Sequence, residues 1–226
     1  MKKIIVILLC VFFSTSFAQD IQRHINVSGN AEITVTADYI HFVIQIRNIN
    51  ESLKKSRETN VNASDELISI LKEFKIKEDD WELSPIEFGK EYSYTREERK
   101  LIGYFSVVNV NVKLRVLEKY YEFISRLSEN TLFEITQSEY GLSDYKKYHK
   151  EAIIKSAKAA KEKAMYLAES MGIKTGKVLQ ITEMSNFDPS PARMNNALLT
   201  KGGSAGNISG DIKISRSVNM QVEILD

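Results

Sequence analysis

The sequence has little cysteine: Cys10 is the only one in 226 residues, and it lies in an apolar N-terminal stretch that we expect to be removed. Cys10 could serve as the lipid-bearing cysteine of a lipoprotein, but Leu9 stands where a small residue is required. The mature chain then has no cysteine. Disulfides, thiolate nucleophiles and Cys-ligated metals are therefore excluded, and stability must come from a packed core.

The chain also lacks an apolar run long enough to cross a bilayer. Residues 4–13 are apolar and follow two lysines, but a spanning helix needs about 20 such residues. Residues 16–18, Ser-Phe-Ala, supply the small side chains that a signal peptidase requires. We therefore predict a signal peptide over residues 1–18, cleaved after Ala18, rather than a retained anchor helix. The protein is predicted to be exported, to the periplasm in a bacterium, and any association with the envelope would be peripheral.

Neither sign of charge is in excess. The chain has 31 basic and 30 acidic residues, and loss of Lys2 and Lys3 with the signal leaves 29 against 30, a formal charge of −1. Phosphate neutralisation requires a surplus of Lys and Arg on one face, so nucleic acid is not a predicted partner. Residues 19–226 are long enough for one substantial core or two small ones, and length alone does not decide between them. We predict a single domain over these residues.

Metal-binding and nucleophile motifs are not found. The three histidines, His24, His41 and His149, are far apart, and none pairs with a second ligand at helical spacing. For each we predict a solvated or supporting role. Ser28 followed by Gly29 lies in a predicted strand rather than at the strand-to-helix turn of a nucleophile elbow.

Two further sequences could suggest ligand binding. Residues 202–206, Gly-Gly-Ser-Ala-Gly, have neither the P-loop lysine nor a helix directly after them, so we predict a flexible linker. The acidic pairs at 79–80 and 97–98 lack the spaced ligands of an EF-hand loop. We predict no catalytic residue, no cofactor-binding residue, no metal site and no enzymatic activity.

Alternating apolar residues predict two N-terminal strands. Over residues 25–36 the odd-numbered positions are mostly apolar and the even-numbered ones polar, and over residues 40–46 Ile and Phe alternate with other residues. With a turn at Ala37 and Asp38 between them, we predict an antiparallel pair with one face on the core. Gly29 interrupts the first strand and predicts a bulge or a close backbone approach.

The middle of the chain predicts a helix, a hairpin and a second helix. Asn50 is the expected cap of a helix whose apolar face includes Val61, and that helix ends before residue 77. Further elements are a weaker strand over 81–94 bent at Pro85, a hairpin tip over 95–100, a return strand over 102–116, a short helix over 118–128 with Tyr121, Ile124 and Leu127 inward, and a strand at 133–135.

The C-terminal part begins with the strongest helix, over residues 145–171. Its stripe of alanines, extended by Met171, predicts close packing. We expect this packing to be on the sheet of its own subunit rather than on a neighbouring subunit. Gly172 is placed to end the helix. A strand over 178–182 follows. Residues 186–210 are rich in Gly, Pro, Asn and Ser and predict a flexible loop. A regular final strand over 212–224 is expected to pair inside a sheet.

The predicted elements amount to an α+β fold with antiparallel sheet packed against a few helices, including one long Ala-rich helix. Residues 25–33, Ile-Asn-Val-Ser-Gly-Asn-Ala-Glu-Ile, resemble the opening strand of the SIMPL-domain family. So do the helix over 157–164 with residues 171–178 after it, and residues 209–214, Ser-Gly-Asp-Ile-Lys-Ile. Ala37 and residues 129–131 depart from the family, which usually has proline and a Gly-Ala-Asn turn there.

The resemblance implies a mostly bacterial, periplasmic family without an accepted catalytic site. Members have been linked to oxidative-stress tolerance and envelope integrity, and at least one forms a large ring-like or channel-like oligomer. We therefore expect a non-enzymatic envelope protein that forms a homo-oligomer. The alternative is a periplasmic small-ligand-binding module or weak hydrolase, using a cleft between the central hairpin and the long helix.

The tyrosines leave two interpretations open. Tyr92, Tyr94 and Tyr104 fall on the predicted central hairpin, where they could form an aromatic patch that anchors an interface. Half-buried strand tyrosines are equally ordinary. Five more lie around the second and third helices: Tyr120, Tyr121, Tyr140, Tyr145 and Tyr148.

Overall fold

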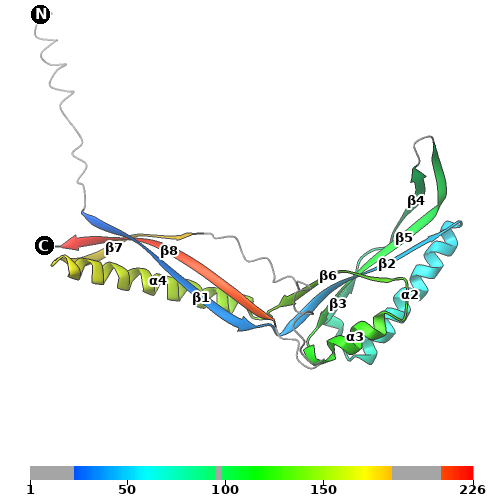
Figure 1. Ribbon diagram of the computed structural model, residues 1–226, viewed down its shortest axis with the longest axis horizontal. Helices are drawn as coiled ribbons and strands as arrows, with labels where there is room; N and C mark the ends of the chain where they lie inside the picture. Colours follow the sequence, from blue (N-terminus) through cyan, green and yellow to red (C-terminus); the bar gives the residue numbers. More distant parts are fainter. Residues whose placement is uncertain (1–22, 95–97, 185–209, 226) are drawn as a thin grey trace, which may run out of the picture. The chain divides into compact units, whose positions relative to one another are not determined.

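The computed structural model describes residues 23–94, 98–184 and 210–225 (Figure 1). The predicted signal peptide over 1–18 and all of the predicted loop over 186–210 except Gly210 lie outside the described residues. Within them the chain forms antiparallel sheets and helices, which confirms the α+β class.

Groups of one to three strands alternate with helices along the chain. In order they are β1 (His24–Thr36), β2 (Tyr39–Asn50), α2 (Leu53–Glu73), η1 (Glu78–Asp80), β3 (Trp81–Leu83), β4 (Glu87–Tyr94), β5 (Arg99–Leu114), η2 (Leu117–Lys119), α3 (Tyr120–Leu127), β6 (Phe133–Gly141), α4 (Tyr145–Ser170), β7 (Lys174–Met184) and β8 (Asp211–Leu225).

A five-stranded sheet holds the larger core. Its order is β3-β5-β2-β6, and β4 also pairs with β5. The alternation along β2 is confirmed, because Ile40, Phe42, Ile44 and Ile46 are all fully buried. Helices α2 and α3 pack on this apolar face; Leu67 of α2 and Phe123 of α3 belong to the same buried cluster. The other face of β2 and β5 carries polar residues such as Gln45 and Asn109, together with Val43 and Val107.

A three-stranded sheet, ordered β1-β8-β7, holds the smaller core. The predicted pairing of β1 with β2 is therefore wrong: β1 lies beside β8, and β2 lies between β5 and β6. The turn at Ala37 and Asp38 leads from one sheet into the other. Alternation fixes which face of a strand is buried, but it does not identify the neighbouring strand. The predicted internal position of the last strand is confirmed, since β8 is central.

Helix α4 covers one face of the three-stranded sheet through its alanines. Ala160 and Ala164 are fully buried and cluster with Val27 of β1 and Met220 of β8. A Cβ atom added to Gly29 would overlap the carbonyl oxygen of Ser156 and would lie 2.8 Å from the Cα of Ala160. Both the alanine stripe on the chain's own sheet and the close approach at Gly29 are thus confirmed.

Helix α2 begins later than Asn50. Its N-cap is Ser52, and the Oδ1 atom of Asn50 instead accepts a hydrogen bond from the backbone N–H of Ser52 at 3.1 Å. Asn side chains favour this local turn as readily as a cap, which explains the difference. At the C-terminus of α4, Gly172 has a φ of 71° and ends the helix as predicted.

A polar seam lies beneath α2. Ser56 and Ser106 are fully buried, and their hydroxyl oxygens lie 2.9 Å apart. Asn60 is also fully buried, and its Nδ2 donates to the carbonyl oxygens of Ile46 at 2.9 Å and Ser106 at 3.2 Å. Small side chains let the helix approach the strands closely, and Asn60 satisfies two carbonyl groups beneath it.

Several predicted inward residues are exposed. Val61 is 51% exposed on α2 and Met171 is 77% exposed after α4. On α3, Phe123 is buried where Tyr121 was expected. These positions lie at the margins of their apolar stripes, where a shift of one residue in the helix start turns the side chain outward. The predicted bend at Pro85 is confirmed, because it separates β3 from β4.

The described chain divides into two compact units. The first contains residues 23–31, 153–184 and 217–225, and the second contains residues 32–94, 98–152 and 210–216. Strands β1 and β8 and helix α4 each contribute residues to both units. The single-domain assignment stays a prediction.

Candidate interaction surface

The β4–β5 hairpin continues past the rest of its sheet. Pairing of β5 with β2 ends at Tyr104, which is opposite Asn50. From Gly103 to Arg99, the only described partner of β5 is β4 (Figure 1). A two-stranded ribbon by itself is marginally stable in water, so the end of this hairpin has surface available for further contacts.

Large apolar side chains are exposed on this hairpin. Exposed fractions are 71% for Tyr94, 52% for Phe88, 48% for Ile102 and 43% for Leu101. Single exposed apolar residues are normal on protein surfaces, but four on one hairpin form a group. We call these four residues the hairpin patch.

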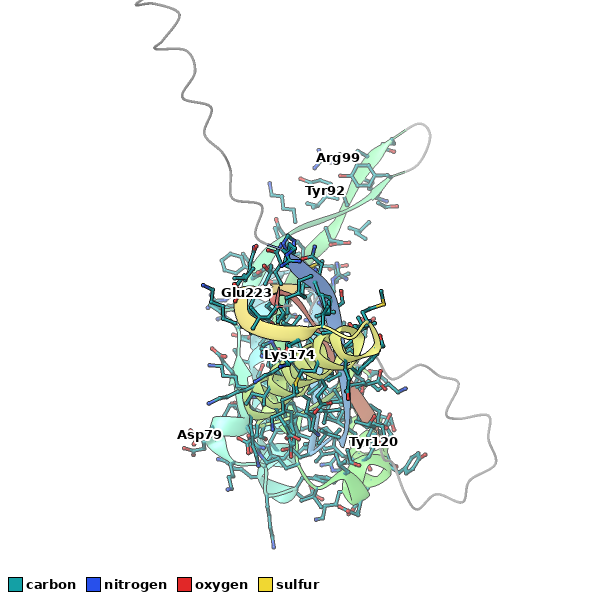
Figure 2. All side chains as sticks on the ribbon, turned by 90° about the vertical axis from the view of Figure 1, so that its left-hand side faces the viewer. Asp79, Tyr92, Arg99, Tyr120, Lys174 and Glu223 are labelled. Atoms are coloured by element: carbon teal, nitrogen blue, oxygen red, sulfur yellow. The ribbon has the colours of Figure 1, made fainter. Side chains whose placement is uncertain are left out.

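Arg99 orders the aromatic side chains at the end of the hairpin. Its guanidinium carbon lies 3.7 Å from the centre of the Tyr92 ring and 5.6 Å from that of Tyr94 (Figure 2 shows Arg99 beside Tyr92). The two rings are 6.5 Å apart. The stack fixes three long side chains before any partner arrives, which lowers the entropy that binding would cost.

The structure divides the remaining tyrosines between the two interpretations. Tyr140 is buried, and Tyr120 is stacked on Phe42 with ring centres 6.0 Å apart. Burial raises the pKa of both phenols above the ordinary value. The hydroxyl of Tyr145 accepts a hydrogen bond from Arg216 at 3.1 Å, and Tyr148 packs on the core. The interface interpretation therefore applies best to the hairpin.

The three histidines lie on three different elements. His24 is exposed at the start of β1, and His149 lies 6.0 Å from the Tyr145 ring. His41 lines a shallow depression of about 280 Å³, together with Glu82, Lys113 and the residues of η1. Among residues 23–94, 98–184 and 210–225, no group of three or more His, Cys, Asp or Glu residues could hold a metal ion.

The structure describes only part of the acidic pairs and none of the glycine-rich residues 202–206. Asp79 and Asp80 both border the same depression as His41, and Asp80 is buried. Glu97 and residues 202–206 lie outside the described residues. The predicted absence of a nucleophile motif from the sequence needs a correction, because residues 202–206, Gly-Gly-Ser-Ala-Gly, fit the G-x-S-x-G spacing of a nucleophile elbow. The predicted absence of catalytic and cofactor-binding residues stays a prediction, as does the predicted cleft beside the long helix.

Asp80 forms a two-pronged ion pair with Arg115. Nε of Arg115 donates to Oδ2 at 2.8 Å, and Nη2 donates to Oδ1 at 2.7 Å. Nη1 of the same arginine donates to the hydroxyl of Ser143 at 2.7 Å. The hydrogen bonds from Arg115 hold the pKa of Asp80 below its ordinary value. The pair joins η1 to the end of β5 and to the turn before α4.

Arg115→Ala should weaken the fold and reduce its acid sensitivity. We expect a loss of about 2 kcal/mol in the free energy of unfolding at pH 7, the usual value for charged hydrogen bonds. Because the folded pKa of Asp80 is depressed, its stabilising effect is present above the ordinary carboxyl pKa and is lost as pH falls through the folded value. Urea unfolding of both proteins at pH 7 and pH 3 should show the difference narrowing in acid; an unchanged difference would contradict this account.

The sequence pattern did not identify the hairpin patch. Alternation along the return strand over 102–116 predicts Ile102 on the same face as Val108 and Val110. The register shifts between Glu91 and Tyr92, however, and Ile102 falls in that irregularity. No charge or spacing rule marks Arg99 as a residue that stacks on Tyr92 from the paired strand. A short apolar run at Leu101 and Ile102, directly after a charged turn, was the available signal.

Comparison with known proteins gives a family and a relative. The model of a family described as "SIMPL: Protein of unknown function (DUF541)" matches residues 25–222. A protein of Edwardsiella ictaluri (strain 93-146), named "Uncharacterized protein YggE", is 26% identical over 173 residues, which cover 74% of this chain and 71% of the relative. The match spans residues of both compact units. In the part of the chain that the structure describes, no helix is both long and apolar enough to span a membrane.

Proposed function

Because the chain belongs to the SIMPL family, whose function is unknown, we propose from its surface that it is a non-enzymatic envelope protein that assembles into a homo-oligomer. The protein acts after export, in the periplasm, and contributes to envelope integrity or to tolerance of oxidative stress. The signal-like sequence over residues 1–18 supports the location. The proposed role rests on assembly and contact rather than on turnover of a substrate.

The hairpin patch is the observation that carries the assembly proposal. Tyr94, Leu101 and Ile102 are on the two-stranded end of the hairpin, and Phe88 lies where β5 also pairs with β2. Burying these four side chains against another protein surface would remove them from water. At about 25 cal/mol per Å², each aromatic or aliphatic side chain can contribute one or more kcal/mol to association. Tyrosine and arginine, which stack here as Tyr92 and Arg99, are enriched among residues that dominate interface energies.

The strand edge beside the patch offers a second means of contact. Within the described residues β4 pairs with β5 alone, so the backbone N–H and C=O groups on its other edge face away from any described strand. Such an edge readily pairs with a strand of another chain. Strand pairing and burial of the patch would act together in one interface.

Light scattering coupled to size-exclusion chromatography tests the proposal on residues 19–226. We expect a discrete oligomer at micromolar concentration. Leu101→Glu should raise the concentration at which it dissociates by about 30-fold, which corresponds to about 2 kcal/mol at a central contact. Met165→Glu is the matched control, because Met165 is 51% exposed on α4 and outside the patch.

The experiment distinguishes failure of the assembly proposal from failure of the proposed interface. A monomer at tens of micromolar for the unmodified chain would contradict assembly itself. An oligomer that Leu101→Glu and Met165→Glu leave equally intact would retain assembly but place its interface elsewhere than the hairpin.

A further inference from the structure

A groove lies on the face of the three-stranded sheet opposite α4. It has a volume of about 370 Å³, and Val27, Met220 and six polar residues line it. Along β1 and β8, Val27 and Met220 are buried toward the alanines of α4, so the residues alternating with them face away from the helix. The six polar residues come from all three strands: Asn26 and Ser28 of β1, Gln180 and Thr182 of β7, and Asn219 and Gln221 of β8.

None of the groove's lining residues is charged. Charged residues make up 27% of the whole chain, and the outward positions of a solvated sheet are where they normally gather. Of the neighbouring outward positions on β1 and β8, Asn30 and Ser217 are uncharged, whereas Glu223, which follows Gln221 on the same face, is charged. The polar side chains that line the groove itself are four carboxamides and two hydroxyls.

Much of the hydrogen-bonding capacity of these side chains is unused. The hydroxyl of Ser28 donates to Oδ1 of Asn219 at 2.7 Å, which orients the amide, and Nε2 of Gln180 lies 3.4 Å from Oγ1 of Thr182. The side chains of Asn26 and Gln221 form no hydrogen bond with the described residues. Each carboxamide can both donate and accept, so the groove offers alternating donors and acceptors at strand spacing.

From these features we propose that the groove binds a neutral oligosaccharide bearing N-acetyl groups. Neighbouring sugar hydroxyls both donate and accept, and an acetamido group matches a side-chain carboxamide in the same two ways. An open sheet face covers only one side of a ligand, whereas sites for single small molecules bury most of the ligand surface. An extended chain of sugar units gains enough contacts by lying along the face. The proposal is independent of assembly through the hairpin.

Isothermal titration of residues 19–226 with chitohexaose, the hexamer of N-acetylglucosamine, tests the inference. We expect saturable binding with a Kd of about 1 mM or tighter, and weaker binding of cellohexaose, which lacks the acetamido groups. Asn26→Ala combined with Gln221→Ala should weaken chitohexaose binding about tenfold or more, as expected for two ordinary hydrogen bonds. Because neither side chain bonds to the described protein, the melting temperature should stay unchanged.

Gln137→Ala is the matched control, because Gln137 is an exposed carboxamide on β6 of the other sheet. It should leave chitohexaose binding unchanged. Absence of saturation at several millimolar chitohexaose would overturn the proposal, and so would equal losses in the double variant and in Gln137→Ala. If the double variant changed the mass in light scattering while chitohexaose did not bind, the groove would be a contact between copies of this chain, and the glycan proposal would be wrong.

Discussion

Gly29→Ala should be among the most damaging single substitutions in this protein, with an expected loss of about 3 kcal/mol or more in the free energy of unfolding. The added methyl group would overlap the carbonyl oxygen of Ser156 and approach the Cα of Ala160. Both contacts are backbone atoms of α4, which cannot move aside as a side chain can. The helix would have to lift from β1, and the buried contacts of Ala160 with Val27 and Met220 would be lost. Urea unfolding followed by circular dichroism measures the effect.

Asn30→Ala is the control for this substitution. Asn30 is the next residue of the same strand and is exposed, so its removal should change stability by about 0.5 kcal/mol or less. Gly29→Ser should be at least as damaging as Gly29→Ala, because it adds the same Cβ and one more atom. If Gly29→Ala unfolded at the same urea concentration as the unmodified chain, the close seating of α4 on β1 would be wrong.

Asn60→Asp should cost about 4 kcal/mol at pH 7, although it changes the side chain's size very little. The amide nitrogen of Asn60 donates to the carbonyl oxygens of Ile46 and Ser106, and the residue is fully buried. A carboxylate would place a negative charge against both carbonyl oxygens, with no donor to replace the amide. The seam beneath α2 would therefore contain a buried charge that lacks a partner.

The cost of Asn60→Asp should depend on pH in a defined direction. Burial and the two carbonyl oxygens would raise the folded pKa of the new carboxyl above its ordinary value of about 3.9. Below the ordinary value the group is protonated in both states, and its O–H can donate to one carbonyl. As pH rises toward the folded pKa, only the unfolded state releases the proton, so the variant loses stability across that range.

Two further variants isolate the charge in this second experiment. Asn60→Ala removes both hydrogen bonds without adding a charge, so it should cost about 2 kcal/mol with no added pH dependence. Asn62→Asp adds the same charge at an exposed position of α2 and should be nearly neutral. Equal stability of Asn60→Asp at pH 4 and pH 7 would contradict the proposed geometry of the seam.

The sequence predicts the elements of this fold better than their neighbours in the sheets. The spacing of Ile40, Phe42, Ile44 and Ile46 directly indicates a strand with one buried face, because a period of two allows no other regular structure. The alanine stripe of α4 and Gly29 on β1 each indicate a surface that another element approaches closely. These signals lie within one element, or in the complementary sizes of two packed surfaces.

The alternation of residues along β1 does not identify the strand that pairs with it. Ser28 is hydrogen-bonded to Asn219 across 191 residues of sequence, whereas β2 follows β1 after a two-residue turn that suits a hairpin. Both arrangements bury the same apolar face, so the alternation cannot distinguish them. The three-dimensional structure distinguishes the two, because it places β1 beside β8 and packs α4 closely against Gly29.

The candidate surfaces were still less accessible to sequence analysis. Tyr92 and Tyr94 were correctly placed on a hairpin, but Arg99 stacks on them only because the register of β4 and β5 brings it opposite Tyr94. The groove joins residues from β1, β7 and β8, whose order in the sheet does not follow their order in the chain. Interaction surfaces of this kind depend on register and on strand order together.

The division of the chain into interleaved segments has a consequence for how the protein matures. The unit built on the three-stranded sheet needs residues 23–31, 153–184 and 217–225, so it cannot form until the last strand has been synthesised. Among the described strands β1 is synthesised first and β8 last, so β1 must wait for its neighbour in the sheet. The growing chain therefore holds an unpaired strand until β8 is made, a state vulnerable to mispairing.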